Sequence, residues 1–130
     1  MSSTPFRFAN TVRSRATLNI SPFLNKRMVH SVTSAQEFNS AISQGKVLVD
    51  FYATWCGPCK MISPLLEKLE PQFPDIKFLK LDTEEVPEIA SQFTVSNVPT
   101  FLFFKDGQQI DVVKGAAPAK LKASIENLNN

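Results

Sequence analysis

The sequence predicts an α/β domain in which a central five-stranded mixed sheet carries four helices on its two faces. Apolar, strand-like runs alternate with amphipathic, helix-like segments, and the order βαβαβαββα places a hairpin before the last helix. The chain has 130 residues, 43% of them hydrophobic, which is enough for one domain with a substantial core.

The first predicted elements are a short strand near 29–32, a helix and a buried strand. Ser34 and Glu37 have the spacing of a capping box, so a helix is expected to start there and to end near Gly45. Residues 47–53 are almost continuously apolar, which is typical of a strand buried on both faces.

The middle of the chain predicts a helix, a strand and a shorter helix. Residues 57–70 place apolar side chains at helical spacing, and Pro64 inside them predicts a kink. Residues 76–81 read as a strand, and Pro87 is expected in the first turn of the next helix.

The last third predicts a hairpin and a closing helix. Two strands over 100–104 and 110–113 flank a turn that contains Asp106-Gly107, and a helix is expected to begin at Pro118.

Composition and charge exclude several classes of protein. No apolar run reaches the roughly 18 residues of a membrane span, and two cysteines are too few for a disulfide-rich secreted scaffold. A structural zinc site is disfavoured because the chain adds only one histidine to its two cysteines. Residues 37–130 carry nine lysines against twelve acidic residues, which disfavours nucleic-acid binding by the folded part.

Residues 1–28 are rich in Arg and Ser and contain no acidic residue. This pattern is typical of an organelle transit peptide, and the Arg content favours the mitochondrion, with processing expected near Arg27 to Val29. A disordered basic tail is the alternative.

Both cysteines lie in Trp55-Cys56-Gly57-Pro58-Cys59-Lys60, between a predicted buried strand and the start of a helix. A helix N-terminus favours negative charge, so the Cys56 thiolate is expected to be stabilised there and to act as the nucleophile. Cys59 faces the same side of the helix and can resolve a mixed disulfide on Cys56. A structural disulfide and half of a zinc site are the alternatives. The first would close too short a loop to constrain the unfolded chain much, and the second lacks two ligands.

These motifs carry a resemblance: residues 29–130 resemble the thioredoxin family along their whole length. The resemblance rests on WCGPCK, the preceding VDFYATW, the later SNVPTFLFFKDGQ and the pair Gly115-Ala116. It implies a thioredoxin fold and a reductase of protein disulfides that binds no cofactor or metal and carries electrons on its two cysteines. Thioredoxins are themselves a standard example of a lowered thiol pKa, so that lowering is a family property.

The resemblance also implies partners and a location. An NADPH-dependent thioredoxin reductase would re-reduce the protein, and disulfide-containing proteins such as peroxiredoxins would be its clients. The expected form is a monomer that binds no nucleic acid. With the leader 1–28 before the domain 29–130, the chain resembles a mitochondrial thioredoxin, which implies the matrix.

Two charged residues take roles from the resemblance. Asp50 matches the buried acid of the family, which would accept the Cys59 proton, and desolvation would keep this carboxyl partly protonated. A solvent-exposed aspartate at a strand end is the alternative. Lys80 matches the lysine that modulates this acid, and a solvated strand lysine is its alternative.

A substrate surface is implied as well. Pro99 matches the family's cis-proline facing the cysteines, and Gly57 and Pro58 shape the site between them. The expected apolar patch consists of Trp55, Gly57, Pro58, Val98, Pro99, Gly115 and Ala116, although Val98 and Ala116 can also be read as the edge of the core. Tyr52 stands where many members of the family have Trp, and Asn97 stands where some have Gly or Cys.

Two rival functions stay open at this stage. The same cysteine pair could run in reverse, as in an oxidase or isomerase. Some proteins of this fold are instead binding modules whose cysteines are dispensable.

Overall fold

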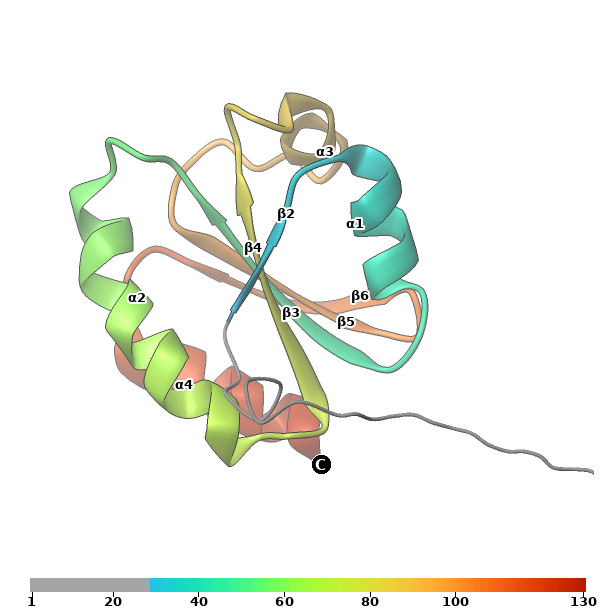
Figure 1. Ribbon diagram of the computed structural model, residues 1–130. Coiled ribbons are helices and arrows are strands. Elements are labelled where there is room, and N and C mark those ends of the chain that lie inside the picture. The colour runs from blue at the N-terminus through green and yellow to red at the C-terminus, as the bar shows by residue number, and fades with distance from the viewer. Residues whose placement is uncertain (1–28) are drawn as a thin grey trace, which may run out of the picture.

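The computed structural model describes residues 29–130, and the predicted transit peptide lies outside the described residues. Five strands form one sheet in the order β2-β4-β3-β5-β6, as Figure 1 shows. The strands are β2 (His30–Val32), β4 (Ile76–Asp82), β3 (Lys46–Tyr52), β5 (Thr100–Lys105) and β6 (Gln108–Lys114). The helices are α1 (Ala35–Ile42), α2 (Gly57–Leu69), α3 (Pro87–Gln92) and α4 (Pro118–Asn129), with a 3-10 turn, η4 (Glu70–Gln72), after α2.

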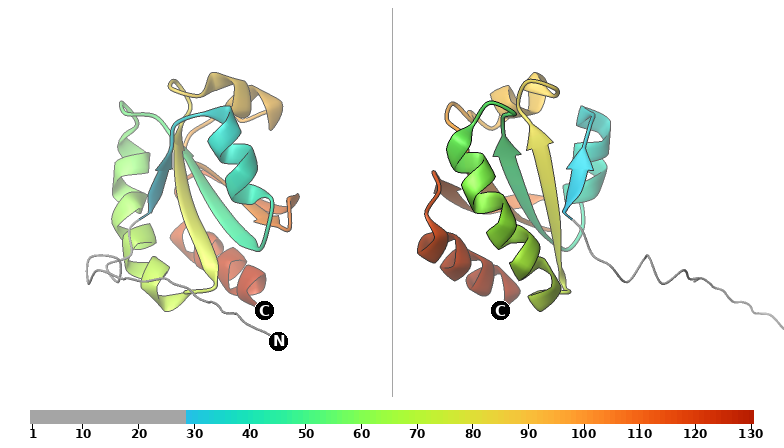
Figure 2. Two further views of the ribbon diagram at one scale, coloured as in Figure 1. Left: turned by 45° about the vertical axis from the view of Figure 1, so that its right-hand side comes forward. Right: turned by 60° about the vertical axis from the view of Figure 1, so that its left-hand side comes forward.

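The sheet is mixed, as predicted. β4 pairs in parallel with both β2 and β3, whereas β5 pairs antiparallel with β3 and β6. Helices α1 and α3 cover one face, and α2 and α4 cover the other (Figures 1 and 2). None of the helices among residues 29–130 is long and apolar enough to span a bilayer.

Strand β3 lies in the middle of the sheet and divides its side chains between two cores. Val49 and Phe51 belong to the core under α1 and α3, whereas Leu48 belongs to the core under α2 and α4. Because side chains alternate along a strand, Asp50 points to the same face as Leu48. This alternation therefore places a carboxyl group beneath α2.

The start of α1 matches the prediction in part. The Ser34 hydroxyl accepts a hydrogen bond from the Glu37 N–H at 3.1 Å, which is the expected N-cap. The Glu37 carboxylate accepts from the N–H of Thr33 at 2.9 Å, one residue before the cap. The helix ends at Ile42, because Ser43 is its C-cap.

The hairpin is tighter than predicted. Its strands extend until only Asp106 and Gly107 separate them, with φ of 51° and 89°. Two positive φ values in a two-residue loop are those of a type I′ turn, which favours Asp-Gly. The Asp106 carboxylate also accepts from the Gly45 N–H at 2.8 Å, which joins this turn to the loop before β3.

Strand β6 is irregular where it faces β5. The register shifts between Phe103 and Phe104, whose partners are Asp111 and Gln109, so Ile110 between them is a bulge residue. Its side chain is 51% exposed. Pro64 lies within α2, and the kink that it predicts stays a prediction.

Candidate active site

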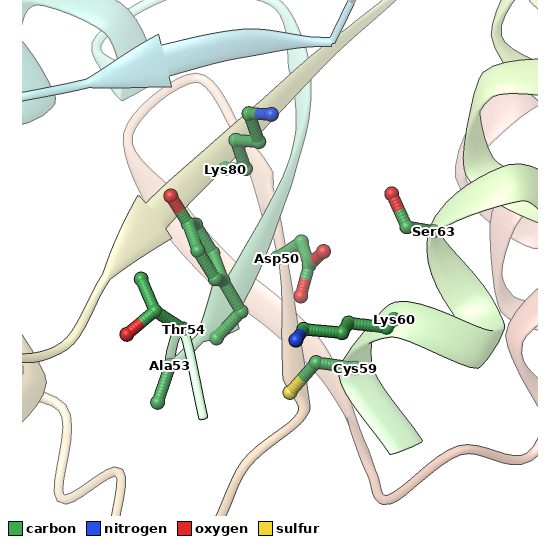
Figure 3. Close-up of a pocket in the computed structure, with 8 residues that line it drawn as sticks. Asp50, Ala53, Thr54, Cys59, Lys60, Ser63 and Lys80 are labelled. Atoms are coloured by element: carbon green, nitrogen blue, oxygen red, sulfur yellow. The ribbon is translucent and has the colours of Figure 1, made fainter. Parts of the chain in front are cut away.

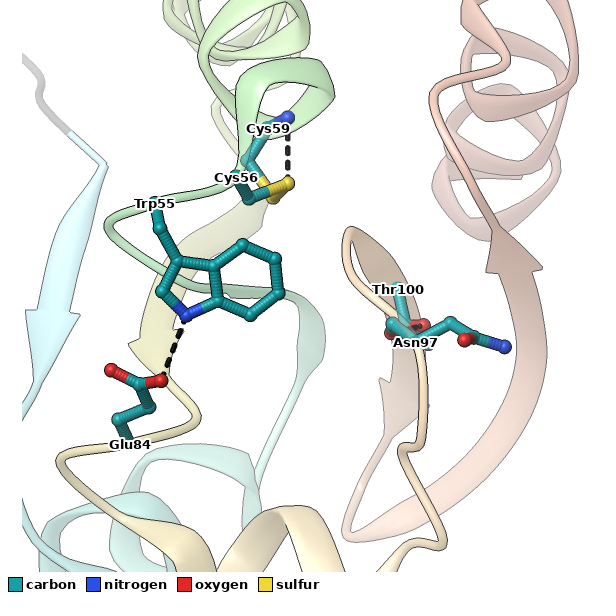
Figure 4. Close-up of a disulfide and its surroundings, with 6 residues drawn as sticks. All are labelled: Trp55, Cys56, Cys59, Glu84, Asn97 and Thr100. Carbon is teal, nitrogen blue, oxygen red and sulfur yellow. Dashed lines mark hydrogen bonds between the residues drawn. A yellow bond between two sulfur atoms is a disulfide. The ribbon is translucent and has the colours of Figure 1, made fainter.

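The two cysteines lie where α2 begins. Cys56 is the N-cap residue, and its Sγ accepts a hydrogen bond from the Cys59 N–H at 3.1 Å (Figure 4). The two residues form a disulfide, with their Cα atoms 5.3 Å apart, inside the usual range. The first turn of α2 thus points the Cys59 N–H at the Cys56 sulfur, and this arrangement at a helix N-terminus stabilises a thiolate when the bond is reduced.

Gly57 and Pro58 occupy the first two positions of α2. Proline is well suited to the first turn, since its fixed φ is helical and the N–H it lacks has no partner within the helix there. Both residues are exposed, and the space around the Gly57 Cα is open. The dipeptide between the cysteines therefore begins α2 as an exposed turn.

The loop before β5 faces the disulfide. Val98-Pro99 is a cis peptide bond, as the resemblance implies. The Pro99 carbonyl accepts a hydrogen bond from the Gly115 N–H at 2.8 Å, which connects this loop to the end of β6. Val98 packs against the cluster formed by Ala53 and the two cysteines. Ala116, the residue after Gly115, is exposed.

Trp55 is the most conspicuous exposed side chain next to the cysteines. It is 68% exposed, whereas Cys56 is only 3% exposed. Its indole Nε1–H donates to the Glu84 carboxylate at 2.8 Å, as Figure 4 shows. The Glu84 N–H in turn donates to Asp82 at 2.8 Å, at the end of β4. The indole is thus held over the site by the loop between β4 and α3.

Behind the disulfide, a cavity of about 330 Å³ separates α2 from β3 and β4 (Figure 3). Asp50 and Lys80 line it from the sheet, and Cys59, Lys60 and Ser63 line it from α2. The remaining lining residues are Tyr52, Ala53 and Thr54. Asp50 and Lys80, the two charged residues predicted from the sequence, therefore line the same cavity as Cys59.

Asp50 is buried, so the solvent-exposed alternative is wrong. Its side chain is 5% exposed, and its Oδ1 receives no hydrogen bond from the residues that the structure describes. Burial raises the pKa of Asp50 from 3.8 to about 7, against a smaller lowering by the charge of Lys80. Lys80 lies beside it in the parallel register of β3 and β4 and is half-buried. A carboxyl group of this kind takes up or gives off a proton near neutral pH.

No group of three or more metal-ligating side chains occurs within residues 29–130. The site combines a disulfide at a helix N-terminus, a titratable acid behind it and an exposed indole in front. This combination suits thiol–disulfide exchange, in which a thiolate attacks a disulfide sulfur.

Three contributors were missed by reasoning from the sequence. Glu84 bonds to Trp55 across a loop, and no local pattern announces that pair. Ser63 is four residues after Cys59, so helical spacing alone places it on the same side of α2. Lys60 enters the cavity from the position next to Cys59.

Comparison with known proteins gives a consistent result. The family model described as Thioredoxin matches residues 29–127. Thioredoxin-2 of Pyricularia oryzae is 50% identical over 101 residues, which cover 77% of this chain and 59% of that protein. Thioredoxin-1 of Saccharomyces cerevisiae is 52% identical over 99 residues, which cover 75% of this chain and 96% of that protein. "Thioredoxin-3, mitochondrial" of the same yeast is 46% identical over 101 residues, which cover 77% and 80%.

Solved structures agree with the sequence relatives. The thioredoxin of Malassezia sympodialis has a TM-score of 0.76 and 42% identity, covering 78% of this chain and 94% of that one. A chain from work on the thiol resolving mechanism in yeast mitochondrial 1-Cys peroxiredoxin via glutathione/thioredoxin systems has a TM-score of 0.73. It is 43% identical, and the match covers 76% of this chain and 94% of that one.

Proposed function

The chain belongs to the thioredoxin family, and from this premise we propose that it reduces protein disulfides with electrons that a thioredoxin reductase draws from NADPH. It is a thiol–disulfide oxidoreductase with a redox-active Cys56–Cys59 pair. The observation that carries the proposal is the position of this pair, at the N-terminus of α2 and beside an exposed indole.

The reaction moves two electrons from the protein to its client. The Cys56 thiolate attacks one sulfur of the client disulfide, which forms a mixed disulfide and releases the other sulfur as a thiolate. The Cys59 thiolate then attacks the Cys56 sulfur, which closes the Cys56–Cys59 disulfide and releases the second client thiolate. Two protons from the protein thiols and solvent complete the client dithiol.

Asp50 serves as the proton acceptor for Cys59 in this proposal. Its pKa near 7 lets the carboxylate take the Cys59 proton when the thiol must become a nucleophile. Lys80 modulates this acid, because its charge lowers the pKa that burial raises. Both residues line the cavity with Cys59, which supports these roles.

The client is expected to lie across the side of the disulfide that is flanked by Trp55 and by the loop at Val98. Trp55 would cover one side of it, and the backbone at Val98 and Pro99 would pair with an extended segment, next to Gly115 and Ala116. Gly57 and Pro58 keep this approach open. Peroxiredoxins are one proposed class of client, and the yeast structural neighbour from the peroxiredoxin work supports it. We propose that the protein acts as a monomer, without nucleic acid or bound metal.

The function is tested by NADPH oxidation in the presence of Saccharomyces cerevisiae thioredoxin reductase and insulin as the protein disulfide. Residues 29–130 are expected to turn over, and the Cys56→Ser variant is expected to give only the background rate, since it lacks the nucleophile. Circular dichroism of both proteins serves as the control for folding. A folded wild-type domain without turnover would contradict the reductase and favour an oxidase or a binding module. A cell-based activity that survives Cys56→Ser together with Cys59→Ser would identify the binding module.

The mitochondrial matrix is the proposed location, with residues 1–28 as a cleaved transit peptide. The acid-free, Arg-rich composition of this segment supports it, as does the likeness to "Thioredoxin-3, mitochondrial" of Saccharomyces cerevisiae.

Import of the full chain into isolated yeast mitochondria tests this location. We expect a protease-protected product that begins near Arg27 to Val29, and N-terminal sequencing of that product locates the cut. The control is residues 29–130 alone, which should stay outside. A protected product that still begins at Met1 would contradict cleavage, and the absence of any protected product would contradict the location.

A further inference from the structure

The cavity behind the disulfide has a polar wall that the exchange of sulfur atoms does not use. Its volume of about 330 Å³ is many times what one water molecule needs. Asp50 is buried at one side of it, with Oδ1 unbonded to any described residue. A proton that reaches this carboxylate from Cys59 must still travel to solvent, and the cavity, which Lys60 and Thr54 line from the exposed surface, is the space through which water can carry it.

Ser63 is placed to bind such water. It lies one helical turn after Cys59 on α2, is half-buried, and lines the cavity on the side opposite Asp50 (Figure 3). Its hydroxyl forms no hydrogen bond with the residues that the structure describes, so both its donor and its acceptor capacity are unused. The serine side chain therefore faces the space between the acid and the helix and has no hydrogen-bond partner among residues 29–130.

We propose that Ser63 is a positioning residue that holds water in this cavity and so connects the Asp50 carboxyl group to solvent. The inference rests on the proposed role of Asp50 as the proton acceptor for Cys59. It adds a route for the proton after that transfer, on residues of this chain that the exchange step leaves idle.

The charged neighbours of Asp50 make a hydroxyl the suitable relay. Lys80 faces it from β4 and Lys60 enters the cavity from α2, but an ammonium group has no acceptor, so it cannot accept one hydrogen bond while it donates another. A hydroxyl accepts one hydrogen bond while it donates another. Tyr52, two residues after Asp50 on β3, also brings a hydroxyl, and burial together with nearby carboxylates raises its pKa. This second hydroxyl supplies the comparison that the test needs.

The proton balance is simple. Cys59–SH transfers its proton to the Asp50 carboxylate and becomes the thiolate that closes the disulfide. Asp50–COOH then donates to a water molecule held by Ser63, the chain of hydrogen bonds passes a proton to solvent, and the carboxylate is restored. No electron moves in these steps, and the client thiolate takes its proton from solvent.

The test is a single turnover of the reduced domain, residues 29–130, mixed rapidly with insulin and followed by the fluorescence of Trp55 from pH 6 to 9. The Ser63→Ala variant is expected to react about tenfold more slowly at pH 7, within the range that general acid–base assistance supplies. Alanine is a good helix former, so α2 is expected to remain intact. Ser63→Thr keeps a hydroxyl and is expected to keep most of the rate.

Two further readouts separate a relay from a packing effect. Imidazole added as a mobile proton carrier should restore the rate of Ser63→Ala, because it replaces the missing route. The acidic limb of the pH profile should move to higher pH, since loss of the hydroxyl-held water leaves the Asp50 carboxylate less stabilised and raises its pKa. Tyr52→Phe, which removes the other half-buried hydroxyl of the cavity, should change neither readout.

The outcomes distinguish this inference from the function on which it rests. In one outcome Asp50→Asn slows the turnover, whereas Ser63→Ala behaves like the wild type in its rate, in the acidic limb of its pH profile and in its response to imidazole. Asp50 then keeps its role and Ser63 has none. Equal loss in Ser63→Ala and Ser63→Thr without imidazole rescue would also overturn the inference. A rescued defect in Tyr52→Phe alone would assign the route to Tyr52 instead. If Asp50→Asn leaves the rate unchanged, the proposed role of Asp50 fails and the inference fails with it.

Discussion

Replacing Cys59 with serine is expected to stop the reaction halfway, with the client covalently attached to Cys56. The attacking sulfur and the start of α2 remain, so the mixed disulfide still forms. Its release requires a second thiolate close to Cys56, and serine cannot provide one. Turnover in the NADPH-coupled assay should fall on the order of 10³-fold or more, as expected for loss of a group that takes part covalently. Non-reducing electrophoresis with insulin should display an adduct that dithiothreitol removes.

The matched control for this adduct is Cys56→Ser, which should form none. Both cysteines are almost fully buried, so exposure does not separate them. Cys59 lines the cavity behind the disulfide with Asp50, whereas Cys56 caps α2 next to the exposed Trp55, so Cys59 is the less well placed of the two to attack a client. An adduct of similar yield in Cys56→Ser would reverse the assignment of nucleophile and resolving cysteine.

Replacing Asp50 with asparagine is expected to stabilise the oxidised domain at pH 8 and to leave it nearly unchanged at pH 4. Asp50 has a pKa of about 7 in the folded protein and 3.8 as its ordinary value. Between these values the folded state binds more protons than the unfolded state, so stability falls as the pH rises through this window. Below about pH 4 both states hold the proton, and above about pH 8 neither does, so the penalty is absent in the first range and complete in the second.

The full penalty is at most about 4 kcal/mol, since each pKa unit corresponds to about 1.4 kcal/mol. Urea unfolding at pH 4, 6 and 8, with the disulfide intact, measures it as the difference between wild type and Asp50→Asn. Asp75→Asn, at an exposed aspartate, is the matched control and should give a difference that stays the same across this pH range. A constant difference between wild type and Asp50→Asn would show that Asp50 does not titrate in this window.

Much of the fold could be predicted from the sequence because its signals are local. The apolar run that becomes β3, the serine that caps α1 and the prolines that open α3 and α4 each act within a few residues. The hairpin lies where the sequence predicts it, but both of its strands are longer than predicted. Turn chemistry identifies Asp106-Gly107, whereas the length of the paired strands depends on how β6 finds its register on β5.

The site divides in the same way. Cys56 and Cys59 are recognisable because strand, turn and helix follow one another in the chain. The burial of Asp50 depends on which face of β3 meets α2, and the bond from Trp55 to Glu84 depends on a loop 29 residues away. Likewise, that Pro99 is cis follows from the resemblance and from no signal in the neighbouring residues. Such features arise from tertiary packing, which local patterns do not contain.

The two edges of the sheet bear on how this protein behaves when it is concentrated. On one edge β2 offers only three residues, and on the other the bulge at Ile110 interrupts the straight course of β6. Exposed polar side chains, Gln108, Gln109 and Lys114, also line that second edge. Open strands are templates on which further chains can assemble into aggregates, and short, bulged or charged edges oppose this. The fold can therefore leave a large apolar indole uncovered for docking while giving neighbouring copies little backbone on which to extend the sheet.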